Sequence, residues 1–519
     1  MEARVAADAA TARRAAGPAL VLVGFMGAGK STAARTLSVE LGVQAIDSDH
    51  ELERRLGETI ASYFDREGEA AFRATEEALI LELLERAGGQ VVALGGGAVQ
   101  SERVRDALAG HTVVHLEVEA DEAWRRASGG SRPLARDRGR FDQLHADREA
   151  VYASVADAVL PPAGRDVVRN ALPALSALSA APAGTRLIWA TASSGDYPVF
   201  LGEGLIAAGF MPPLGGRPFV VTDANVARHQ VVAGHERVVV DAGEQHKTMA
   251  AAEAVLRHLA HAGAERGDLV VAVGGGVVGD LAGFCAAIYQ RGMRHVQVPT
   301  TLVAQVDSAY GGKTGVDLPE GKNYAGAYHQ PSAVVCDPSA LATLPPEELA
   351  AGQAEVIKTA LIAGGTLWAR VRQGGDADAE VIAGCARTKL AVVAEDERDG
   401  GRRQVLNLGH TIGHAIEAAT SYSRYRHGEA VGIGLLAALR LSGRDALRDE
   451  VEGLLAARGL PVAFAGASVE DVEALVARDK KREWGRVPFV LLEAPGRVTP
   501  GHDVTPGDLR AAIEEVRGV

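Results

Sequence analysis

The sequence predicts an α/β protein in which parallel sheets are flanked by helices and a mainly helical part follows. Short apolar runs alternate with amphipathic stretches over roughly the first two thirds of the chain, the pattern of parallel strands joined by crossover helices. Two glycine-rich turns follow apolar runs, and a helical period dominates from residue 345 onward. At roughly 100–200 residues per domain, 519 residues suggest about three folding units.

The composition is that of an ordinary globular protein and excludes several function classes. Hydrophobic residues make up 47% of the chain and charged residues 23%, which excludes disorder of the whole chain. The 54 Lys and Arg residues against 67 Asp and Glu residues give a net charge of −13, which argues against general binding of nucleic acid or anionic membrane. No apolar run has the length of a membrane helix, and three cysteines without a CxxC pair favour a reducing cytoplasm.

The expected elements follow in order along the chain. In the first part, apolar runs at 19–23, 91–94 and 113–116 predict strands, and the pattern at 31–41 predicts a helix. An Ala/Pro/Gly/Ser-rich stretch at 179–185 predicts a linker. In the second part, strands are predicted at 219–221, 237–240, 269–273 and 295–298. We therefore expect two α/β units in succession, the second of which continues into helices.

Residues 24–32 read GFMGAGKST and satisfy the phosphate-loop pattern GxxxxGK[ST] between a predicted strand and a predicted helix. In such a loop, backbone N–H groups face the phosphates, a lysine neutralises the charge of the β- and γ-phosphates, and a hydroxyl ligates Mg²⁺. Lys30 and Ser31 hold the last two positions. The motif predicts a nucleotide-dependent phosphotransferase.

Charged residues further along suit an acceptor pocket for this unit. Asp47 and Asp49 follow a predicted strand, where one carboxylate could hold Mg²⁺ through water and the other accept a hydroxyl proton. Taken alone, such a pair is more often a set of helix-capping groups. Arg73 and Arg148 suit bidentate contact with a planar carboxylate, and the triple glycine at 95–97 permits close approach to a ligand.

This set resembles the shikimate kinase family over about 18–178. The similarity rests on GFMGAGKST, the Asp-x-Asp pair, the Phe-Arg segment, the GGG loop and an Arg-Pro-Leu lid. The resemblance implies that Asp49 contacts the hydroxyl to be phosphorylated, that Ser31 ligates Mg²⁺ and that Asp47 holds it through water. It implies ATP contacts from Gly27, Ala28, Gly29, Lys30, Ser31, Thr32 and Arg132. It implies shikimate contacts from Asp49, Arg73, Gly96 and Arg148, and it leaves the roles of Arg136 and Arg138 in the lid open.

A second glycine-rich turn, GGGVVGD at 274–280, contains GxGxxG after a predicted strand. The common dinucleotide fold would place an acid about twenty residues on, at the end of the next strand. Here VPTT stands at that place, and the acidic candidates for a ribose, Asp223 and Glu244, lie upstream. We therefore expect dinucleotide phosphates on this loop, in a topology other than that of the common dehydrogenases.

Histidines near the C-terminal end predict a metal site. His410 and His414 lie four residues apart on one helical face, and His427 follows thirteen residues later. This spacing suits zinc or a similar divalent ion, although two histidines alone are as often surface or capping residues. Glu355, which we expect at the start of another helix, could add a carboxylate. Around these residues lie further cations, Arg291, Lys313, Lys322, Lys358, Lys389 and Arg403, for which a solvated face is the usual explanation. The glycine-rich settings of Lys313 and Lys322 favour phosphate or carboxylate recognition instead.

This region resembles the 3-dehydroquinate synthase family from residue 186 to the end of the chain. The motifs GEQHK, VGGGVVGDLAGF, AEVIK, NLGHTIGHAIE and HGEAV stand in the family's order. The resemblance implies a divalent ion, Zn²⁺ or Co²⁺, on Glu355, His410 and His427, and it makes His414 a substrate contact rather than a ligand. It implies NAD contacts from Asp223, Asn225, Glu244, Lys247, Gly275, Gly276, Val277, Asp280, Thr300, Thr301, Asp307, Lys313, Lys322 and Thr343.

The same resemblance implies the reaction and its substrate. With NAD and metal, 3-deoxy-arabino-heptulosonate 7-phosphate would become 3-dehydroquinate with release of phosphate and no net use of NAD. Catalytic roles would fall to Lys313, His414 and Arg291, beside Asp49 and Lys30 in the kinase part. Substrate contacts would come from Arg291, Lys313, Lys322, Asn323, Lys358, Lys389, Arg403, Asn407, His414 and Lys481, with Lys481 preferred over its neighbour Lys480.

The motifs together predict a bifunctional, cytoplasmic enzyme of the aromatic pathway that acts on small molecules, with a homodimer through the synthase part as one arrangement. The predicted segments are a flexible tail 1–17, a kinase domain 18–178, a linker 179–185, an NAD-binding α/β half 186–344 and a mainly helical metal and substrate half 345–519. The alternative is a gluconate or nucleotide kinase fused to a metal-dependent polyol dehydrogenase. A non-catalytic nucleotide-binding module would have no need of Lys30, Ser31, Asp47 and Asp49.

Overall fold

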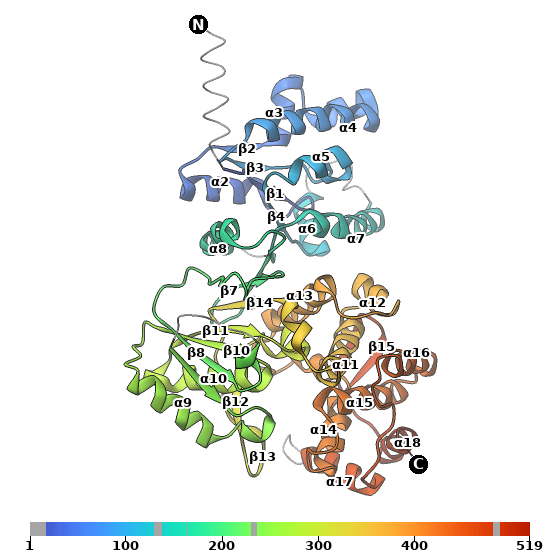
Figure 1. Ribbon diagram of the computed structural model, residues 1–519. Helices are drawn as coiled ribbons and strands as arrows, with labels where there is room; N and C mark the ends of the chain where they lie inside the picture. Colours follow the sequence, from blue (N-terminus) through green and yellow to red (C-terminus); the bar gives the residue numbers. More distant parts are fainter. Residues whose placement is uncertain (1–16, 129–136, 163–164, 230–235, 481–487, 519) are drawn as a thin grey trace. The chain divides into compact units, whose positions relative to one another are not determined.

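The protein is described by a computed structural model that covers residues 17–128, 137–162, 165–229, 236–480 and 488–518 (Figure 1). The chain forms two compact units: residues 1–180 with 184–190, and residues 181–183 with 191–519. Almost all of the expected tail, 1–17, lies outside the described residues. Among the described helices, none combines the length and the apolar character that a membrane span requires.

The first unit is built on a parallel sheet with the strand order β2-β3-β1-β4-β5-β6. Its central strands are buried along almost their whole length, because helices pack against the sheet, and they therefore read as continuous apolar runs. The strands are β1 Leu20–Val23, β2 Ala45–Asp47, β3 Val91–Ala93, β4 Thr112–Leu116, β5 Ala158–Leu160 and β6 Arg186–Ala190. The helices are α2 Lys30–Leu41, α3 Ser48–Leu56, α4 Ile60–Arg86, α5 Glu102–Leu108, α6 Ala120–Ala127, α7 Arg138–Val155 and α8 Arg165–Ala177.

Strand β6 lies in the sheet of the first unit, whereas the sequence pattern placed its residues at the start of the second. Its Leu187 and Ile188 pair in parallel with Ala158 and Val159 of β5. An apolar run such as RLIWA suits the edge of either sheet, and the linker before it gives no indication of which one it joins. The first unit therefore includes one more strand than the pattern predicts.

The second unit begins with another parallel sheet, in the order β7-β14-β11-β10-β8-β9. Its strands are β7 Tyr197–Leu201, β8 Pro218–Asp223, β9 Glu236–Val240, β10 Leu269–Gly274, β11 Arg294–Pro299 and β14 Ala333–Cys336. Helices α9 Met249–His261 and α10 Gly276–Ile288 pack near it. An antiparallel hairpin that the sequence pattern did not predict, β12 Lys313–Leu318 with β13 Gly321–Tyr328, lies against α10.

The rest of the second unit is mainly helical, as expected, with one further hairpin, β15 Phe489–Ala494 and β16 Arg497–His502. Its helices are α11 Pro346–Ala363, α12 Gly365–Val371, α13 Ala379–Glu395, α14 His410–Ala419, α15 His427–Leu441, α16 Asp445–Ala456, α17 Val469–Lys480 and α18 Pro506–Glu515. Helix α15 contacts both α11 and α14. A side chain at Gly428 would overlap the Ala351 carbonyl of α11, and one at Gly434 would overlap the Gly409 carbonyl before α14. Glycine therefore permits the close packing of these three helices.

Candidate functional sites

The phosphate loop of the first unit connects β1 to α2 in the expected strand–loop–helix order. Gly27 and Gly29 have positive φ values of 86° and 89°, which only glycine adopts readily. Lys30 Nζ donates to the carbonyls of Gly24 at 2.8 Å and Phe25 at 3.0 Å, so its ammonium lies over the loop. No side chain caps the N-terminus of α2, and its first amides face the place where phosphates bind in such loops.

Ser31 and Asp47 line one cavity of about 580 Å³. The Asp47 carboxylate also accepts from the amides of Asp49 at 3.1 Å and His50 at 3.3 Å, and so caps α3. Asp47 can therefore cap α3 and also hold Mg²⁺, because Oδ1 accepts both amide hydrogen bonds and Oδ2 accepts neither. A hydroxyl and a carboxylate are hard oxygen donors, which fit Mg²⁺.

The triple glycine loop gathers the residues expected to bind the acceptor. A Cβ at Gly95 would lie 2.6 Å from Asp49 Oδ1, and a Cβ at Gly97 would overlap the Arg73 guanidinium. The Gly96 carbonyl accepts from Arg148 Nη1 at 3.2 Å. Glycine at these positions therefore allows a carboxylate and two guanidinium groups from α3, α4 and α7 to converge on one loop.

Glu76 belongs to this site, although the sequence analysis gave it no role. It is buried, and its Oε2 lies 2.6 Å from Arg73 Nη1. A Cβ at Gly95 would also lie 2.8 Å from Glu76 Oε1, which places Glu76 beside Asp49. Burial raises the pKa of Glu76, Arg73 opposes this, and the Asp49 carboxylate adds to it. The i, i+3 spacing from Arg73 on α4 was the available signal.

The lid is only partly described. Arg132 and Arg136 lie outside the described residues, so the expected ATP contact of Arg132 remains a prediction. Arg138, at the start of α7, pairs with Asp121 and Asp142 and lies 5.7 Å from the centre of the Trp124 ring. In this structure Arg138 therefore links α7 to α6 through its contacts with Asp121 and Trp124.

In the second unit, a cavity of about 1310 Å³ lies between the α/β part and the helical part. It brings together all of the residues expected to contact NAD except Lys313, namely Asp223, Asn225, Glu244, Lys247, Gly275, Gly276, Val277, Asp280, Thr300, Thr301, Asp307, Lys322 and Thr343. His414, His427, Asn323 and Glu417 also line it. One cavity thus joins the glycine loop to the histidine cluster.

The glycine loop leads from β10 into α10. A Cβ at Gly275 would lie 2.8 Å from the Thr301 methyl group, and a Cβ at Gly276 would lie 2.9 Å from Ser308 Oγ. No side chain caps the N-terminus of α10. Backbone amides at such a helix start suit a pyrophosphate, because the helix dipole favours negative charge there.

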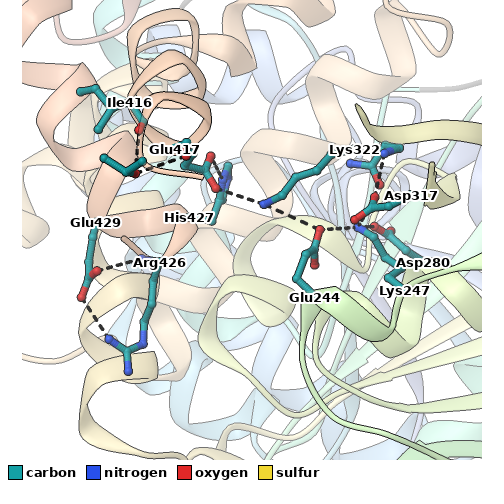
Figure 2. A network of polar contacts seen from close by, with 12 residues as sticks. Glu244, Lys247, Asp280, Asp317, Lys322, Ile416, Glu417, Arg426, His427 and Glu429 are labelled. Carbon is teal, nitrogen blue, oxygen red and sulfur yellow. Dashed lines mark hydrogen bonds and ion pairs between the residues drawn. The ribbon is translucent and has the colours of Figure 1, made fainter. Parts of the chain in front are cut away.

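A buried lysine organises the acidic residues of this cavity. Lys247, 3% exposed, places Nζ 2.9 Å from Glu244 Oε1, 3.3 Å from Asp280 Oδ2 and 3.8 Å from Asp317 Oδ1 (Figure 2). Burial raises the pKa of Asp280 to about 6, although Lys247 opposes the shift. Asp223 Oδ1 instead accepts from the amides of Asn225 and Val226 and fixes the turn after β8. Asp317 was not predicted.

The expected metal ligands meet at one point. Glu355 Oε1 lies 3.6 Å from His410 Nε2 and 3.3 Å from His427 Nε2. One nitrogen each of His410, His414 and His427 also lies within 4.8 Å of the others. Glu355 lies in the middle of α11 and not at a helix start as expected, because α11 already begins at Pro346.

The Glu355 carboxylate fits a cation. It is completely buried, and neither of its oxygens meets the geometry of a hydrogen bond, although Lys358 Nζ lies 2.5 Å away. Burial raises the pKa of Glu355, but Lys358, His410 and His427 outweigh burial and leave it well below its usual value. A carboxylate with two or three imidazoles is the donor set of Zn²⁺ or Co²⁺ sites.

His427 bridges two carboxylates, Glu355 and Glu417. Burial lowers the pKa of His427, but its interactions with these two carboxylates outweigh burial and raise it to about 10. For Glu417, burial raises the pKa, whereas His427 and Lys322 lower it to about 2. The carboxylates of Glu355 and Glu417 thus lie beside His427, and Glu417 also lies beside Lys322. Glu417 is a further residue that the sequence analysis did not assign.

Several of the expected substrate cations bind protein groups. Asp307, on the π-helix Ala304–Ser308, lies 3.3 Å from Lys358 Nζ and pairs with Lys389. Burial raises the pKa of Asp307, but these two lysines outweigh burial and lower it to about 2. Arg403 is buried and donates to the Gly311 carbonyl at 2.8 Å. Lys313 pairs with Asp399, another residue that was not predicted.

Some predicted substrate residues are not brought to the cavity. Arg291 is exposed and does not line it. The cavity lining also leaves out Lys313, Asn407 and three buried cations, Lys358, Lys389 and Arg403. Lys481 lies outside the described residues, and so does the side chain of Lys480. Arg424, Arg426 and Arg478, none of them predicted, line the cavity instead.

The fold and these sites define a P-loop phosphotransferase followed by a second enzyme with a dinucleotide loop beside a metal site. Residues 26–175 match the family model for shikimate kinase. Residues 237–351 and 352–482 match those for the N-terminal and C-terminal parts of 3-dehydroquinate synthase. The 3-dehydroquinate synthase of Nitrobacter winogradskyi is 45% identical over 353 residues, which cover 61% of this chain and 92% of that protein.

Solved structures agree with this result. ValA, a 2-epi-5-epi-valiolone synthase from Streptomyces hygroscopicus with NAD⁺ and Zn²⁺ bound, is 28% identical with a TM-score of 0.57 over 62% of this chain and 96% of its own. A 2-deoxy-scyllo-inosose synthase in complex with carbaglucose-6-phosphate, NAD⁺ and Co²⁺ shares the fold at 24% identity, with a TM-score of 0.56 over 64% of this chain and 99% of its own. The chain belongs to the 3-dehydroquinate synthase family and carries a shikimate kinase domain before it. The bifunctional enzyme expected from the motifs is thereby confirmed.

Proposed function

We propose that the first site phosphorylates shikimate with ATP and Mg²⁺ and that the second converts 3-deoxy-arabino-heptulosonate 7-phosphate to 3-dehydroquinate with NAD and a divalent ion. The observation that carries the second assignment is the single cavity that joins the glycine loop, Lys247 and the histidine cluster. The relative ValA, with NAD⁺ and Zn²⁺ bound, supports the cofactor pair.

In the kinase, Lys30 and the amides of α2 hold the nucleotide phosphates, and Ser31 and Asp47 hold Mg²⁺. Arg73, Arg148 and the Gly96 backbone bind the carboxylate and hydroxyl groups of shikimate. Asp49 accepts the proton of the attacked hydroxyl, because its carboxylate lies at the same loop. Glu76 fixes the Arg73 guanidinium through their 2.6 Å ion pair.

In the synthase, Glu355, His410 and His427 hold the divalent ion, and the residues around Lys247 orient the nucleotide. When bound, the ion polarises an alcohol oxygen of the substrate and NAD takes up and returns a hydride. Lys313, Lys358, Lys389 and Arg403 supply positive charge for the carboxylate and phosphate of the substrate, with His414 and Asn323 at the cavity wall. In the absence of the anionic substrate, Asp307 pairs with Lys358 and Lys389 and compensates their positive charge.

A metal-dependent polyol dehydrogenase is the competing function for the second unit. Such an enzyme would form net NADH from glycerol-like alcohols. These substrates are uncharged, so they would not require the set of buried cations found here. The test is to supply the heptulosonate phosphate with catalytic NAD and to follow phosphate and NADH together. Stoichiometric phosphate without NADH supports the synthase, whereas net NADH with glycerol refutes it.

The kinase assignment has its own test in the same chain. ADP should form only when shikimate is added, and Lys30→Ala should remove that activity while phosphate release by the synthase continues. ADP formation that depends on gluconate or on a nucleoside monophosphate instead of shikimate would refute it. Equal ADP formation with and without acceptors would indicate a simple ATPase.

We further propose a homodimer in the cytoplasm, with the domain limits stated above except that the first domain extends through β6. Arg291, expected to bind substrate, is exposed and lies outside the cavity of its own chain, so a second copy that supplies this residue would complete the site. The three cysteines are free and buried, which suits a reducing compartment. Sedimentation of the purified chain tests the dimer, and a monomeric, fully active synthase would refute it.

A further inference from the structure

The Glu417 side chain lies between His427, an expected metal ligand, and Lys322, an expected NAD contact. It lies on α14, is 3% exposed and directs one oxygen to each of two partners (Figure 2). Oε2 lies 3.2 Å from His427 Nδ1, and Oε1 lies 3.2 Å from Lys322 Nζ. A carboxylate this deeply buried needs strong partners, because desolvation of its charge is costly.

We propose that Glu417 is a positioning residue that fixes the His427 ring for metal binding and, through Lys322, couples the metal site to the nucleotide side of the cavity. This inference rests on the proposed synthase function. Glu417 itself is not one of the expected metal ligands, which are Glu355, His410 and His427. We therefore expect its substitution to have effects on metal affinity and on coupling that differ from loss of a ligand.

The geometry at His427 supports the first role. With Nδ1 directed at Glu417, the ring presents Nε2 to Glu355 Oε1 at 3.3 Å, which is where the expected ligands converge. A carboxylate on the far nitrogen of a ligand histidine fixes its tautomer and ring rotation and raises its basicity. His410 has a weaker partner, the neutral Leu408 carbonyl at 3.3 Å. Of these two ligands, His427 alone has a carboxylate at Nδ1, the ring nitrogen that faces away from Glu355.

The surroundings of Lys322 support the second role. This lysine, on β13, lies between Glu417 and Glu244, whose Oε1 is 3.9 Å from Nζ. The Tyr422 ring covers the ammonium at 4.5 Å, a cation–π distance. Glu244 in turn contacts Lys247 at 2.9 Å. An unbroken series of ion pairs thus connects a metal ligand to the acidic residues expected at the ribose.

This series makes the two binding events interdependent. A ribose hydroxyl that donates to Glu244 competes with Lys322 for the same carboxylate oxygen. The ion pair between Lys322 and Glu244 then weakens, and the ion pair between Lys322 and Glu417 strengthens. Conversely, a cation beside His427 alters the field at Glu417 and hence its hold on Lys322. Such coupling is reciprocal, so NAD must change metal affinity by the same factor by which metal changes NAD affinity.

The experiment measures affinity for Co²⁺ and Zn²⁺ by chelator competition on the full chain, with and without NAD. For Glu417→Gln we expect metal affinity to fall by about 10–100-fold, the range for loss of such partners, together with a shifted visible spectrum of the Co²⁺ form. The affinity ratio with and without NAD should differ from one in the wild type and approach one in the variant. Glu417→Asp should recover part of the affinity, because a carboxylate is restored.

Glu429→Gln is the matched control. Glu429 lies on the same helix as His427, and its carboxylate accepts from the Arg426 amide at 2.8 Å at the helix start. An equal loss of metal affinity in this variant would mean that any disturbance of α15 suffices, and it would overturn the proposal. Unchanged affinity and coupling in Glu417→Gln would overturn it as well.

These outcomes are distinct from failure of the proposed function. If the wild-type chain binds neither metal, the synthase assignment fails. If it binds metal and releases phosphate while Glu417→Gln behaves identically, only the role of Glu417 fails. Should Glu417→Gln not fold, Lys322→Gln tests the same link: loss of the NAD–metal coupling supports it, and intact coupling refutes it.

Discussion

His427 Nε2 lies 3.3 Å from Glu355 Oε1, although the two side chains come from different helices, α15 and α11. Their approach depends on the residue after His427. A side chain at Gly428 would overlap the Ala351 carbonyl, one turn before Glu355 on α11. The metal site is therefore as much a product of close helix packing as of its donor atoms.

Gly428→Ala should accordingly weaken metal binding without touching a ligand. The added methyl must push the start of α15 away from α11, and affinity for Zn²⁺ should fall at least about tenfold, equivalent to about 1.4 kcal/mol. Shikimate-dependent ADP formation should persist. Chelator competition and the two activity assays on one preparation check this expectation.

The control for this substitution is Gly453→Ala on α16. A Cβ at Gly453 meets nothing within 4 Å, so alanine should stabilise the helix by up to about 1 kcal/mol and leave metal affinity unchanged. If Gly428→Ala binds metal as tightly as Gly453→Ala, the packing explanation is wrong.

Glu76→Gln should weaken shikimate binding by the kinase. The substitution removes the charged partner of Arg73, and the guanidinium then lacks the 2.6 Å ion pair that fixes it. Loss of such a charged hydrogen bond costs about 1–3 kcal/mol, so the KM for shikimate should rise roughly 5–150-fold, with a smaller change in kcat. Steady-state kinetics at saturating ATP measure both constants.

Glu69→Gln provides the comparison, because Glu69 also lies near Arg73, at 3.8 Å, but is 57% exposed. An exposed pair contributes little, so KM should stay near the wild-type value. Equal effects of the two substitutions would contradict a specific role for Glu76.

The sequence indicates the parts of these sites that local patterns encode. The phosphate loop, the glycine turn after β10 and the strands buried on both faces all follow from runs of neighbouring residues. The β12–β13 hairpin did not follow, because KTGVDL and GKNYAGAY show no clear apolar alternation. Its strands are specified by contacts with α10 and by pairing with each other.

Apart from Glu76, which had a local signal in its spacing from Arg73, the residues that sequence reasoning missed are recognisable from long-range contacts. Glu417 stands inside a motif that was identified, yet its role depends on Lys322 and His427 from other elements. Asp399 pairs with Lys313 across the fold in the same way. The role of such a buried carboxylate depends on which partners the tertiary structure brings next to it, and a local sequence pattern does not encode these partners.

Glu397 should stabilise the second unit above acidic pH. Burial raises its pKa, but hydrogen bonds from Ser193, Ser194 and Gln330 outweigh burial and lower it from 4.5 to about 2. Because the folded state has the lower pKa, the stabilisation is fully present above pH 4.5 and is lost as the pH falls toward 2. Glu397→Gln should therefore lower the free energy of unfolding at pH 7 by about 1–3 kcal/mol.

The difference between Glu397→Gln and the wild type should shrink as the pH falls below 4.5, the usual value of the group. Urea unfolding followed by tryptophan fluorescence at several pH values measures this. Glu395→Gln, whose carboxylate is 65% exposed, should behave like the wild type throughout. A constant difference at all pH values would show that the charge of Glu397 is not responsible.

The last prediction concerns where the kinase can be separated from the synthase. Strand β6 completes the sheet of the first unit through its pairing with β5, and Leu187 within it is completely buried. A fragment that ends at residue 190 should therefore retain shikimate kinase activity and unfold at a higher temperature than one that ends at residue 180. Removal of β6 takes away its buried apolar side chains and exposes the surface that they cover, and at about 25 cal/mol per Å² of apolar surface even part of this loss exceeds 1 kcal/mol. Thermal unfolding and kinase assays of both fragments check the expectation, and identical melting temperatures would show that β6 contributes nothing to the kinase.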